Sequence, residues 1–224
     1  MPVNAVPFHE KEYWQNRFEN ENHFEWLLSW STLDVVVRQY LNPHEPILHL
    51  GCGNSNLAFD LADSGYTHVV NVDYVEAVID HMKEKTREKL NAAYDQIEWY
   101  TGDCLDDLSF LLERSPKREG FSVVLDKSLC DTIACGDDNH QTGQQTLAQR
   151  VMEITRPQGV WITVSFSSER QYIWPSDSQW TWQHEDAVPI NVPQENDKPN
   201  APAIYYYLYI RRKVPTKVLT ESHA

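Results

Sequence analysis

Residues 47–56 read ILHLGCGNSN, and residues 69–74 read VVNVDY. The first stretch has the form of an apolar strand that enters a glycine turn, and the second is an apolar strand that ends in Asp73. Asp73 follows Gly51 by 22 positions, which leaves room for a helix between the two strands. Glycines let a ligand approach the backbone, and an acid at the next strand end accepts hydrogen bonds from ribose hydroxyls. The pattern predicts a site for an adenosine-bearing cofactor at the edge of a parallel sheet.

Strands and helices alternate outward from this stretch. Two helices come first, at 10–20 and 32–40. The spacing then predicts strands at 46–50, 67–72, 97–100, 121–125 and 160–166, with helices at 55–64, 75–91, 105–113 and 144–155. Two last strands, 180–184 and 205–211, have no helix between them, and their connection at 185–203 is rich in Pro, Asn and Asp and is expected to be mobile.

This order predicts an α/β fold of the Rossmann-like, seven-stranded kind. The sheet is expected to be mostly parallel, with a C-terminal antiparallel hairpin and helices on both faces. We expect a single domain over residues 1–212, with residues 1–45 as an amino-terminal helical lid and residues 213–224 as a flexible tail. The length of 224 residues and the apolar fraction of 41% fit one globular domain.

Composition restricts the partners and the compartment. The net charge of -14 argues against a nucleic-acid partner and allows a basic protein partner or a cationic ligand, although it also serves solubility alone. No apolar run reaches the roughly 18 residues of a membrane helix, so no membrane partner is expected. The first residues show no export or import signal, which predicts the cytoplasm, or the nucleus. No pattern indicates an oligomeric state.

Metal and disulfide chemistry are not expected. The four cysteines form no CxxC pair, so we expect reduced and mostly buried thiols rather than a zinc site. The nine histidines form neither an HxxxH nor an HExxH pattern, so no catalytic metal is predicted. The glycine turn also lacks the third glycine of a dinucleotide fingerprint, because Asn56 stands there. That glycine serves a pyrophosphate, so its absence favours a cofactor without phosphate.

At this point the chain resembles the class I S-adenosylmethionine-dependent methyltransferases. LHLGCGNSNL resembles the first motif of that family, VVNVDY the second and YTGDC the third, and the likeness covers about residues 10–212. The segments EYWQNRF and LDKSLCDTI resemble a eukaryotic subfamily that includes lysine methyltransferases acting on translation elongation factor 1-alpha. The last segment departs from the subfamily pattern, since Ser128 replaces the usual glycine and Leu129-Cys130 replaces Thr-Leu. The cofactor side therefore matches better than the substrate side.

The resemblance implies S-adenosyl-L-methionine as the cofactor, S-adenosyl-L-homocysteine as its product, and a set of contacts. Gly51 and Gly53 would lie under the methionine portion, and Asp73 would hold the ribose. Around the adenine it implies Tyr74 against the ring, Asp103 on the amine and the Cys104 backbone on a ring nitrogen. Lys127 would border the sulfonium, and the amino-terminal lid would consist of Trp14, Phe18 and Trp26.

The residues themselves leave some of these roles open. Asp73, Asp103 and Asp126 all follow predicted strands, where they either bind a ligand or cap the next helix. Trp14 and Phe18 are four positions apart and share one helix face, as lid or as core. A second aromatic group, with Trp174, Trp180, Trp182 and Tyr205 to Tyr207, could hold an amine by cation–π attraction, but packing around the hairpin is the favoured interpretation.

The leading functional hypothesis is transfer of a methyl group to a lysine amine of a protein. Its rivals are a small-molecule O- or N-methyltransferase and a cofactor-binding partner protein without turnover. A lysine acceptor, with a reference pKa of about 10.4, must lose its proton before it attacks, which a desolvated channel would favour. Asp126, Asp131 or a tyrosine hydroxyl could take that proton, and the sequence assigns it to none of them, so the catalytic residue is unknown.

Overall fold

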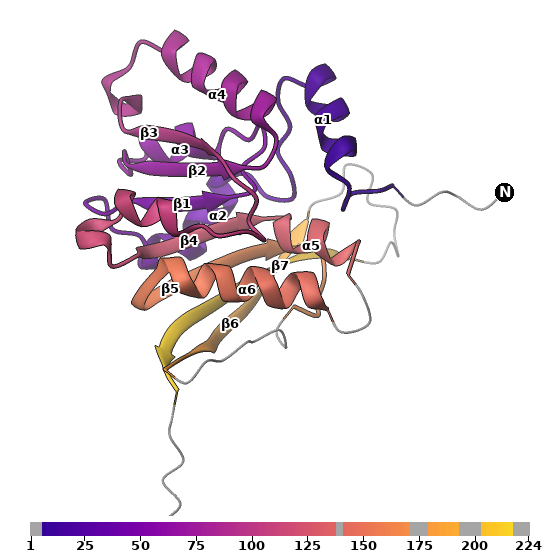
Figure 1. Ribbon diagram of the computed structural model, residues 1–224, viewed down its shortest axis with the longest axis vertical. Helices are drawn as coiled ribbons and strands as arrows, with labels where there is room; N and C mark the ends of the chain where they lie inside the picture. The colour runs from indigo at the N-terminus through magenta and orange to yellow at the C-terminus, as the bar shows by residue number, and fades with distance from the viewer. Residues whose placement is uncertain (1–5, 138–140, 171–178, 193–202, 217–224) are drawn as a thin grey trace, which may run out of the picture.

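The computed structural model describes residues 6–137, 141–170, 179–192 and 203–216, and Figure 1 shows their arrangement. They form one seven-stranded sheet of order β3-β2-β1-β4-β5-β7-β6. Its strands are β1 (Ile47–Leu50), β2 (Val69–Asp73), β3 (Ile97–Thr101), β4 (Phe121–Lys127), β5 (Thr155–Ser165), β6 (Trp180–Val192) and β7 (Ile204–Pro215). The first five strands pair in parallel, and β7 runs antiparallel to both β5 and β6. The predicted fold class is confirmed.

Helices cover both faces of the sheet. One face carries α2 (Trp30–Val37), α3 (Leu57–Asp63) and α4 (Glu76–Glu88), and the other carries α5 (Leu129–Ala134) and α6 (Thr142–Ile154). Figure 1 shows α6 in front of the sheet and α2 and α3 behind it. The helix α1 (Lys11–Asn20) stands at the side, and short 3-10 turns complete the chain, η1 (Arg38–Tyr40), η2 (Ala92–Tyr94), η3 (Ser109–Arg114) and η4 (Pro116–Arg118).

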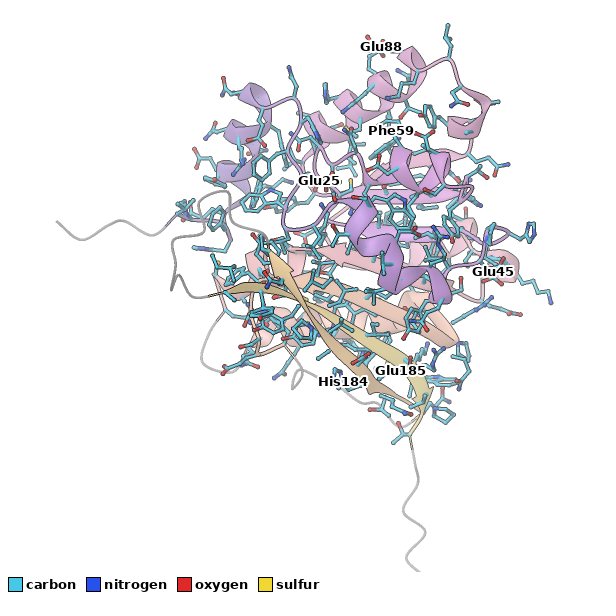
Figure 2. All side chains as sticks on the ribbon, turned by 180° about the vertical axis from the view of Figure 1, so that it is seen from behind. Glu25, Glu45, Phe59, Glu88, His184 and Glu185 are labelled. Carbon is cyan, nitrogen blue, oxygen red and sulfur yellow. The ribbon has the colours of Figure 1, made fainter. Side chains whose placement is uncertain are left out.

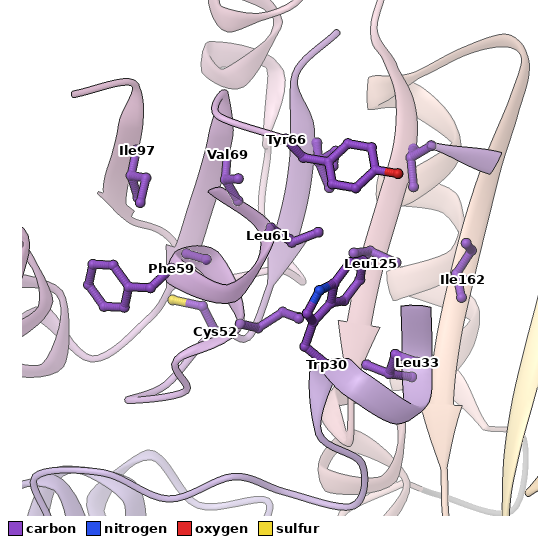
Figure 3. Close-up of a cluster of buried hydrophobic side chains, with 14 of the residues drawn as sticks. Trp30, Leu33, Cys52, Phe59, Leu61, Tyr66, Val69, Ile97, Leu125 and Ile162 are labelled. Atoms are coloured by element: carbon purple, nitrogen blue, oxygen red, sulfur yellow. The ribbon is translucent and has the colours of Figure 1, made fainter. Parts of the chain in front are cut away.

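The core on the α2 and α3 face holds the strands in place. Figure 3 shows Trp30 and Leu61 from the helices against Leu125 and Ile162 from the sheet. The indole nitrogen of Trp30 donates to Ser64 Oγ at 2.7 Å, so its one polar atom is satisfied although the ring is buried. Apolar burial of this kind is worth about 1.5–3 kcal/mol per large side chain. It fixes the strand ends from which the site is built.

One helix prediction was wrong, and one short helix was missed. Residues 105–113 do not form an α-helix, and a 3-10 turn begins only at Ser109. The Asp107 carboxylate accepts the Ser109 N–H at 2.8 Å, and Asp103 accepts the Leu105 N–H at 2.9 Å. Such local bonds offer the backbone an alternative to the helix. The helix α5 was not predicted, because it is six residues long and begins after Ser128, whose φ is +68°.

The prediction of an irregular connection over residues 185–203 was also wrong for residues 185–192, which belong to a strand. The strand β6 continues to Val192, with a bulge between His184 and Asp186, while residues 193–202 lie outside the described part of the chain. An edge strand tolerates both a bulge and Pro189, so the polar composition misled the prediction. The partner strand β7 likewise runs on to Pro215, three residues into the segment expected as a tail.

Two further findings concern the described residues as a whole. None of their helices combines the length and the apolar character that crossing a membrane requires. The cysteines are free thiols, with Cys52, Cys104 and Cys130 buried and Cys135 exposed.

Candidate active site

A cavity of about 430 Å³ lies over the carboxyl ends of β1, β2 and β4. Its volume falls within the range of small-molecule sites. Every residue that the sequence assigned to the cofactor lines it, namely Trp14, Phe18, Trp26, Gly51, Gly53, Asp73, Tyr74, Asp103, Cys104 and Lys127. The structure therefore brings the ten residues together in one place, and the role of each stays a prediction.

The turn after β1 requires glycine at two positions. Gly51 has a φ of +60° and Gly53 a φ of +49°, a conformation that other residues adopt only at a cost. Space is limited as well, because a Cβ on Gly51 would lie 3.0 Å from Leu129 Cδ1 and one on Gly53 would lie 3.3 Å from Phe18 Cζ. The turn is thus shaped by α5 on one side and by the amino-terminal helix on the other.

Asp73 ends β2 and holds this turn. Its Oδ2 accepts the Gly53 N–H at 2.9 Å, and its Oδ1 accepts the Val75 N–H at the start of α4 at 3.0 Å. Asp73 therefore holds the backbone just before α4 and also faces the cavity. Burial raises its pKa to about 6, while the two N–H donors favour the charged form. A carboxylate has about four acceptor positions, so the backbone donors leave room for a hydrogen bond from a ligand.

The other cofactor-side residues sit at neighbouring strand ends. Tyr74 follows Asp73 and is half-buried, with Lys11 Nζ 5.2 Å from its ring centroid. Cys104 is buried after β3, and burial raises the pKa of its thiol, so it stays protonated. Asp103 faces the same cavity and accepts the Leu105 N–H. An acid, an aromatic ring and a buried turn thus lie together along this part of the cavity.

Aromatic side chains from the amino-terminal segment close the cavity. The ring of Trp14 lies 5.7 Å from that of Phe18 and 5.9 Å from that of Trp26. Phe24, which the sequence did not single out, also lines the cavity. The guanidinium of Arg17 lies 4.9 Å from the Phe24 and Trp26 ring centroids, so an internal cation already contacts this aromatic group.

Polar contacts attach this segment to the glycine turn. The Asn54 side chain donates to the Glu21 carbonyl at 2.7 Å and accepts the Phe24 N–H at 3.1 Å. Glu25 accepts from Ser55 Oγ at 2.8 Å and from the Asn56 N–H at 3.2 Å. The second half of the turn therefore binds the amino-terminal segment rather than facing the cavity alone.

Glu25 also forms an ion pair with Lys127, and the sequence did not predict this contact. Lys127 Nζ contacts the Glu25 carboxylate and donates to the Trp26 carbonyl at 2.9 Å. The Lys127 side chain is only 4% exposed. Burial lowers the pKa of Lys127 to about 7, and the carboxylate beside it favours the protonated form.

The two acids considered as proton acceptors do not line the cavity. Asp126 Oδ2 accepts from Trp161 Nε1 at 2.6 Å and from Thr163 Oγ1 at 2.8 Å, on the α6 side of the sheet. Asp131 accepts the Phe166 N–H at 3.0 Å and contacts Arg170. Both carboxylates serve internal networks, and burial raises the pKa of Asp126 to about 6.

The second aromatic group forms no open amine cage in the described residues. Lys213 Nζ lies 5.1 Å from the Trp180 ring centroid, and the Trp182 indole donates to the Ala148 carbonyl at 3.0 Å. Trp174 lies outside the described residues. The favoured interpretation as hairpin packing fits these contacts. In the same part of the chain no group of three His, Cys, Asp or Glu side chains could hold a metal ion.

Comparison with known proteins identifies the family. A family model described as a methyltransferase domain matches residues 41–205. Methyltransferase srdJ of Neurospora crassa is 31% identical over 214 residues, which are 93% of this chain and 85% of that protein. The chain belongs to the methyltransferase domain family. The methyltransferase therefore uses S-adenosylmethionine as its methyl donor, as the sequence predicted.

Other relatives match part of their length only. The human eEF1A lysine and N-terminal methyltransferase is 32% identical over 151 residues, 65% of this chain and 19% of that protein. The Danio rerio protein of the same name is 29% identical over 147 residues, and this chain spans 20% of it. Among solved structures, an S-adenosylmethionine-dependent methyltransferase from Methanosarcina mazei has a TM-score of 0.55 at 13% identity, covering 80% of this chain and 97% of that one. That likeness concerns the fold.

Proposed function

We propose that this methyltransferase transfers a methyl group to a lysine amine of a protein substrate. The observation that carries the proposal is the 29–32% identity to eEF1A lysine and N-terminal methyltransferases over about two thirds of the chain. The net charge of -14 favours a basic protein surface as the partner. The srdJ protein matches a larger share of the chain, and its name specifies no acceptor.

The cofactor-holding residues are part of this proposal. Asp73 would accept the ribose hydroxyls, Tyr74 would lie against the adenine and Asp103 would accept from its amine. The Cys104 backbone would meet a ring nitrogen, and Gly51 and Gly53 would lie under the methionine portion. The fit is supported by the shape of the turn, since a Cβ at either glycine would fill space next to Leu129 or Phe18.

When bound, the cofactor would supply a methyl group activated by its sulfonium, so that a neutral amine could form the N–C bond as the C–S bond breaks and the thioether leaves. The chain has two tasks around that step. Trp14, Phe18 and Trp26 exclude water, which strengthens electrostatic contacts and favours the neutral form of a lysine amine. Lys127 would border the sulfonium, and its charge is balanced by Glu25. With Asp126 and Asp131 engaged elsewhere, the amine would lose its proton to water at the mouth or to a substrate group.

A labelling experiment tests the acceptor class. Radiolabelled S-adenosylmethionine, incubated with the enzyme and a cell extract, should mark a protein band, and hydrolysis of that band should release methyl-lysine. Label in the organic-soluble fraction would favour a small-molecule acceptor and contradict the proposal, as would cofactor binding without transfer. The Asp73→Ala variant should lose the labelled band, whereas the exposed Asp95→Ala variant should keep it.

A further inference from the structure

An exposed apolar patch lies at the carboxyl end of β5. Phe166 directly follows this strand and is 55% exposed, more than any other Phe, Tyr or Trp in the described part of the chain. The last residue of β5, Ser165, pairs with Tyr207 on β7, so Phe166 lies at the level of Tyr206. Ile204, where β7 begins, is also exposed. The name edge patch is used below for Phe166, Ile190, Val192, Ile204 and Tyr206.

The hairpin of β6 and β7 supplies four of these residues. Tyr206 pairs with Ile190, and Ile204 pairs with Val192. Because side chains alternate along a strand, the four share one face of the sheet. Ile190 and Tyr206 are half-buried against the core, whereas Ile204 is exposed. The apolar face therefore continues from the core to the edge of the sheet and becomes more open on the way.

A nearly buried ion pair fixes the backbone at Phe166. Asp131 Oδ2 accepts the Phe166 N–H at 3.0 Å, and Asp131 Oδ1 accepts from Ser165 Oγ at 2.5 Å and from Arg170 Nε at 3.2 Å. The side chains of Asp131 and Arg170 are 4% and 10% exposed. Desolvating such a pair is costly, and here it holds in place a ring that packs little of the core. An exposed aromatic side chain on a fixed backbone is typical of a binding surface, because less freedom is lost on association.

The edge patch lies beside the cavity. Val164, two residues before Phe166, pairs with Lys127 on β4, and Lys127 lines the cavity. None of the five patch residues lines the cavity itself. A single ligand can therefore contact both only if it continues past the mouth of the cavity and over the end of β5, which favours a polypeptide over a small molecule.

The charges at the cavity favour a cationic group on that ligand. The carboxylates of Asp73, Asp103 and Asp137 line it. Among the described lining residues Lys127 is the only Lys or Arg, and Glu25 contacts it. An acidic cavity next to an apolar patch is complementary to a lysine that has apolar neighbours.

We propose that the edge patch binds the protein substrate beside the acceptor lysine, with an apolar side chain of the substrate packed against Phe166. The inference rests on the proposed function and narrows its substrate class to basic segments in which apolar side chains accompany the lysine. Phe166 is then a residue that determines specificity, and the pair of Asp131 and Arg170 positions it.

Two short synthetic peptides of equal charge test this proposal, one with leucine and one with serine beside each lysine. In fluorescence anisotropy the wild type should bind the leucine peptide about tenfold more tightly than the serine peptide, as burial of an apolar side chain predicts. Phe166→Ala should reduce this preference to about twofold. The control Leu90→Ala removes a leucine that is 99% exposed after α4 and should keep the full preference. A wild type without the preference, or a Phe166→Ala variant that keeps it, would overturn the proposal.

Titration of S-adenosylhomocysteine and sedimentation complete the test. Phe166→Ala should bind S-adenosylhomocysteine as the wild type does, since Phe166 lies outside the cavity. If the wild type did not bind S-adenosylhomocysteine, the proposed function would fail; normal binding of this compound without the peptide preference would refute the edge patch alone. A wild-type dimer that Phe166→Ala dissociates would assign the patch to a second copy of the chain and would also overturn the proposal.

Discussion

Removing the Glu25 carboxylate tests whether the amino-terminal segment is held to the cofactor turn. Glu25 contacts Lys127 and accepts from Ser55 and Asn56, so it joins the lid, β4 and the glycine turn. Glu25→Ala deletes all three contacts. Glu25→Gln keeps an acceptor for Ser55 and Asn56 and removes the charge that faces Lys127. The two variants therefore separate the ion pair from the hydrogen bonds.

The size of the effect follows from burial. Lys127 is 4% exposed and Glu25 is 23% exposed, so the cation is almost fully desolvated and the anion is partly hydrated. Removing one partner of a fully buried pair costs about 3–5 kcal/mol, and the hydration of Glu25 lowers this to about 3 kcal/mol. For a chain of this length we expect Glu25→Ala to lower the Tm by about 6–12 °C. Glu25→Gln should lower it by about half as much.

The assay is thermal unfolding together with titration of S-adenosylhomocysteine. Glu25→Ala should weaken binding as well as stability, because the lid loses its attachment. The control is Glu45→Ala, which removes a 2.8 Å ion pair with Arg156 at a distance from Glu25, as Figure 2 shows. That variant should leave the affinity unchanged. If both variants behaved alike, or if Glu25→Ala and Lys127→Met were additive in a double-mutant cycle, the reasoning would be refuted.

Four shorter predictions follow from other contacts. Asp73→Ala should weaken S-adenosylhomocysteine binding by about 1.5–3 kcal/mol in calorimetry. A Cβ on Gly136 would lie 2.6 Å from His9 Cβ, so Gly136→Ala should displace the lid and raise the Kd for S-adenosylhomocysteine about tenfold. An unchanged Kd would contradict the interpretation that His9 holds the lid against Gly136. Ser128 has a φ of +68°, so Ser128→Gly should raise rather than lower the Tm, by about 1–2 °C. Because the folded-state pKa of His49 is about 4, below that of the unfolded chain, the wild type should lose about 3 kcal/mol of stability relative to His49→Leu as denaturant titrations move from pH 7 to pH 4.

The site residues at strand ends could be predicted because topology fixes them. Asp73 and Asp103 end neighbouring parallel strands, so their meeting at one edge follows from the strand order alone. Asp126 could also have been settled from the sequence. Adjacent residues of a strand point to opposite faces, so Asp126 and Lys127 cannot both face one cavity, and the structure turns Asp126 toward Trp161.

The contacts of Glu25 could not be predicted in the same way. Glu25 and Lys127 are 102 positions apart. The spacing of apolar residues predicts individual helices and strands, but it does not predict a contact between an amino-terminal turn and the end of the fourth strand. His49 escaped notice for a different reason. Its burial and the 3.2 Å contact of its Nδ1 with Asn71 Oδ1 are properties of the folded chain that no sequence pattern indicated.

Two of the lid's attachments lie on opposite sides of α1. His9 rests on Gly136 after α5, and Glu25 binds Lys127 at the end of β4. In the sequence the aromatic side chains that cover the cavity lie between these attachments, and Arg17 contacts the rings of Phe24 and Trp26. Opening the cavity requires the loss of one attachment, and the Glu25 side costs more because it breaks a nearly desolvated charge pair. A ligand would therefore enter more readily where His9 meets Gly136. A substitution that separates these two residues should change the association and dissociation rates of the ligand more than it changes the free energy of unfolding.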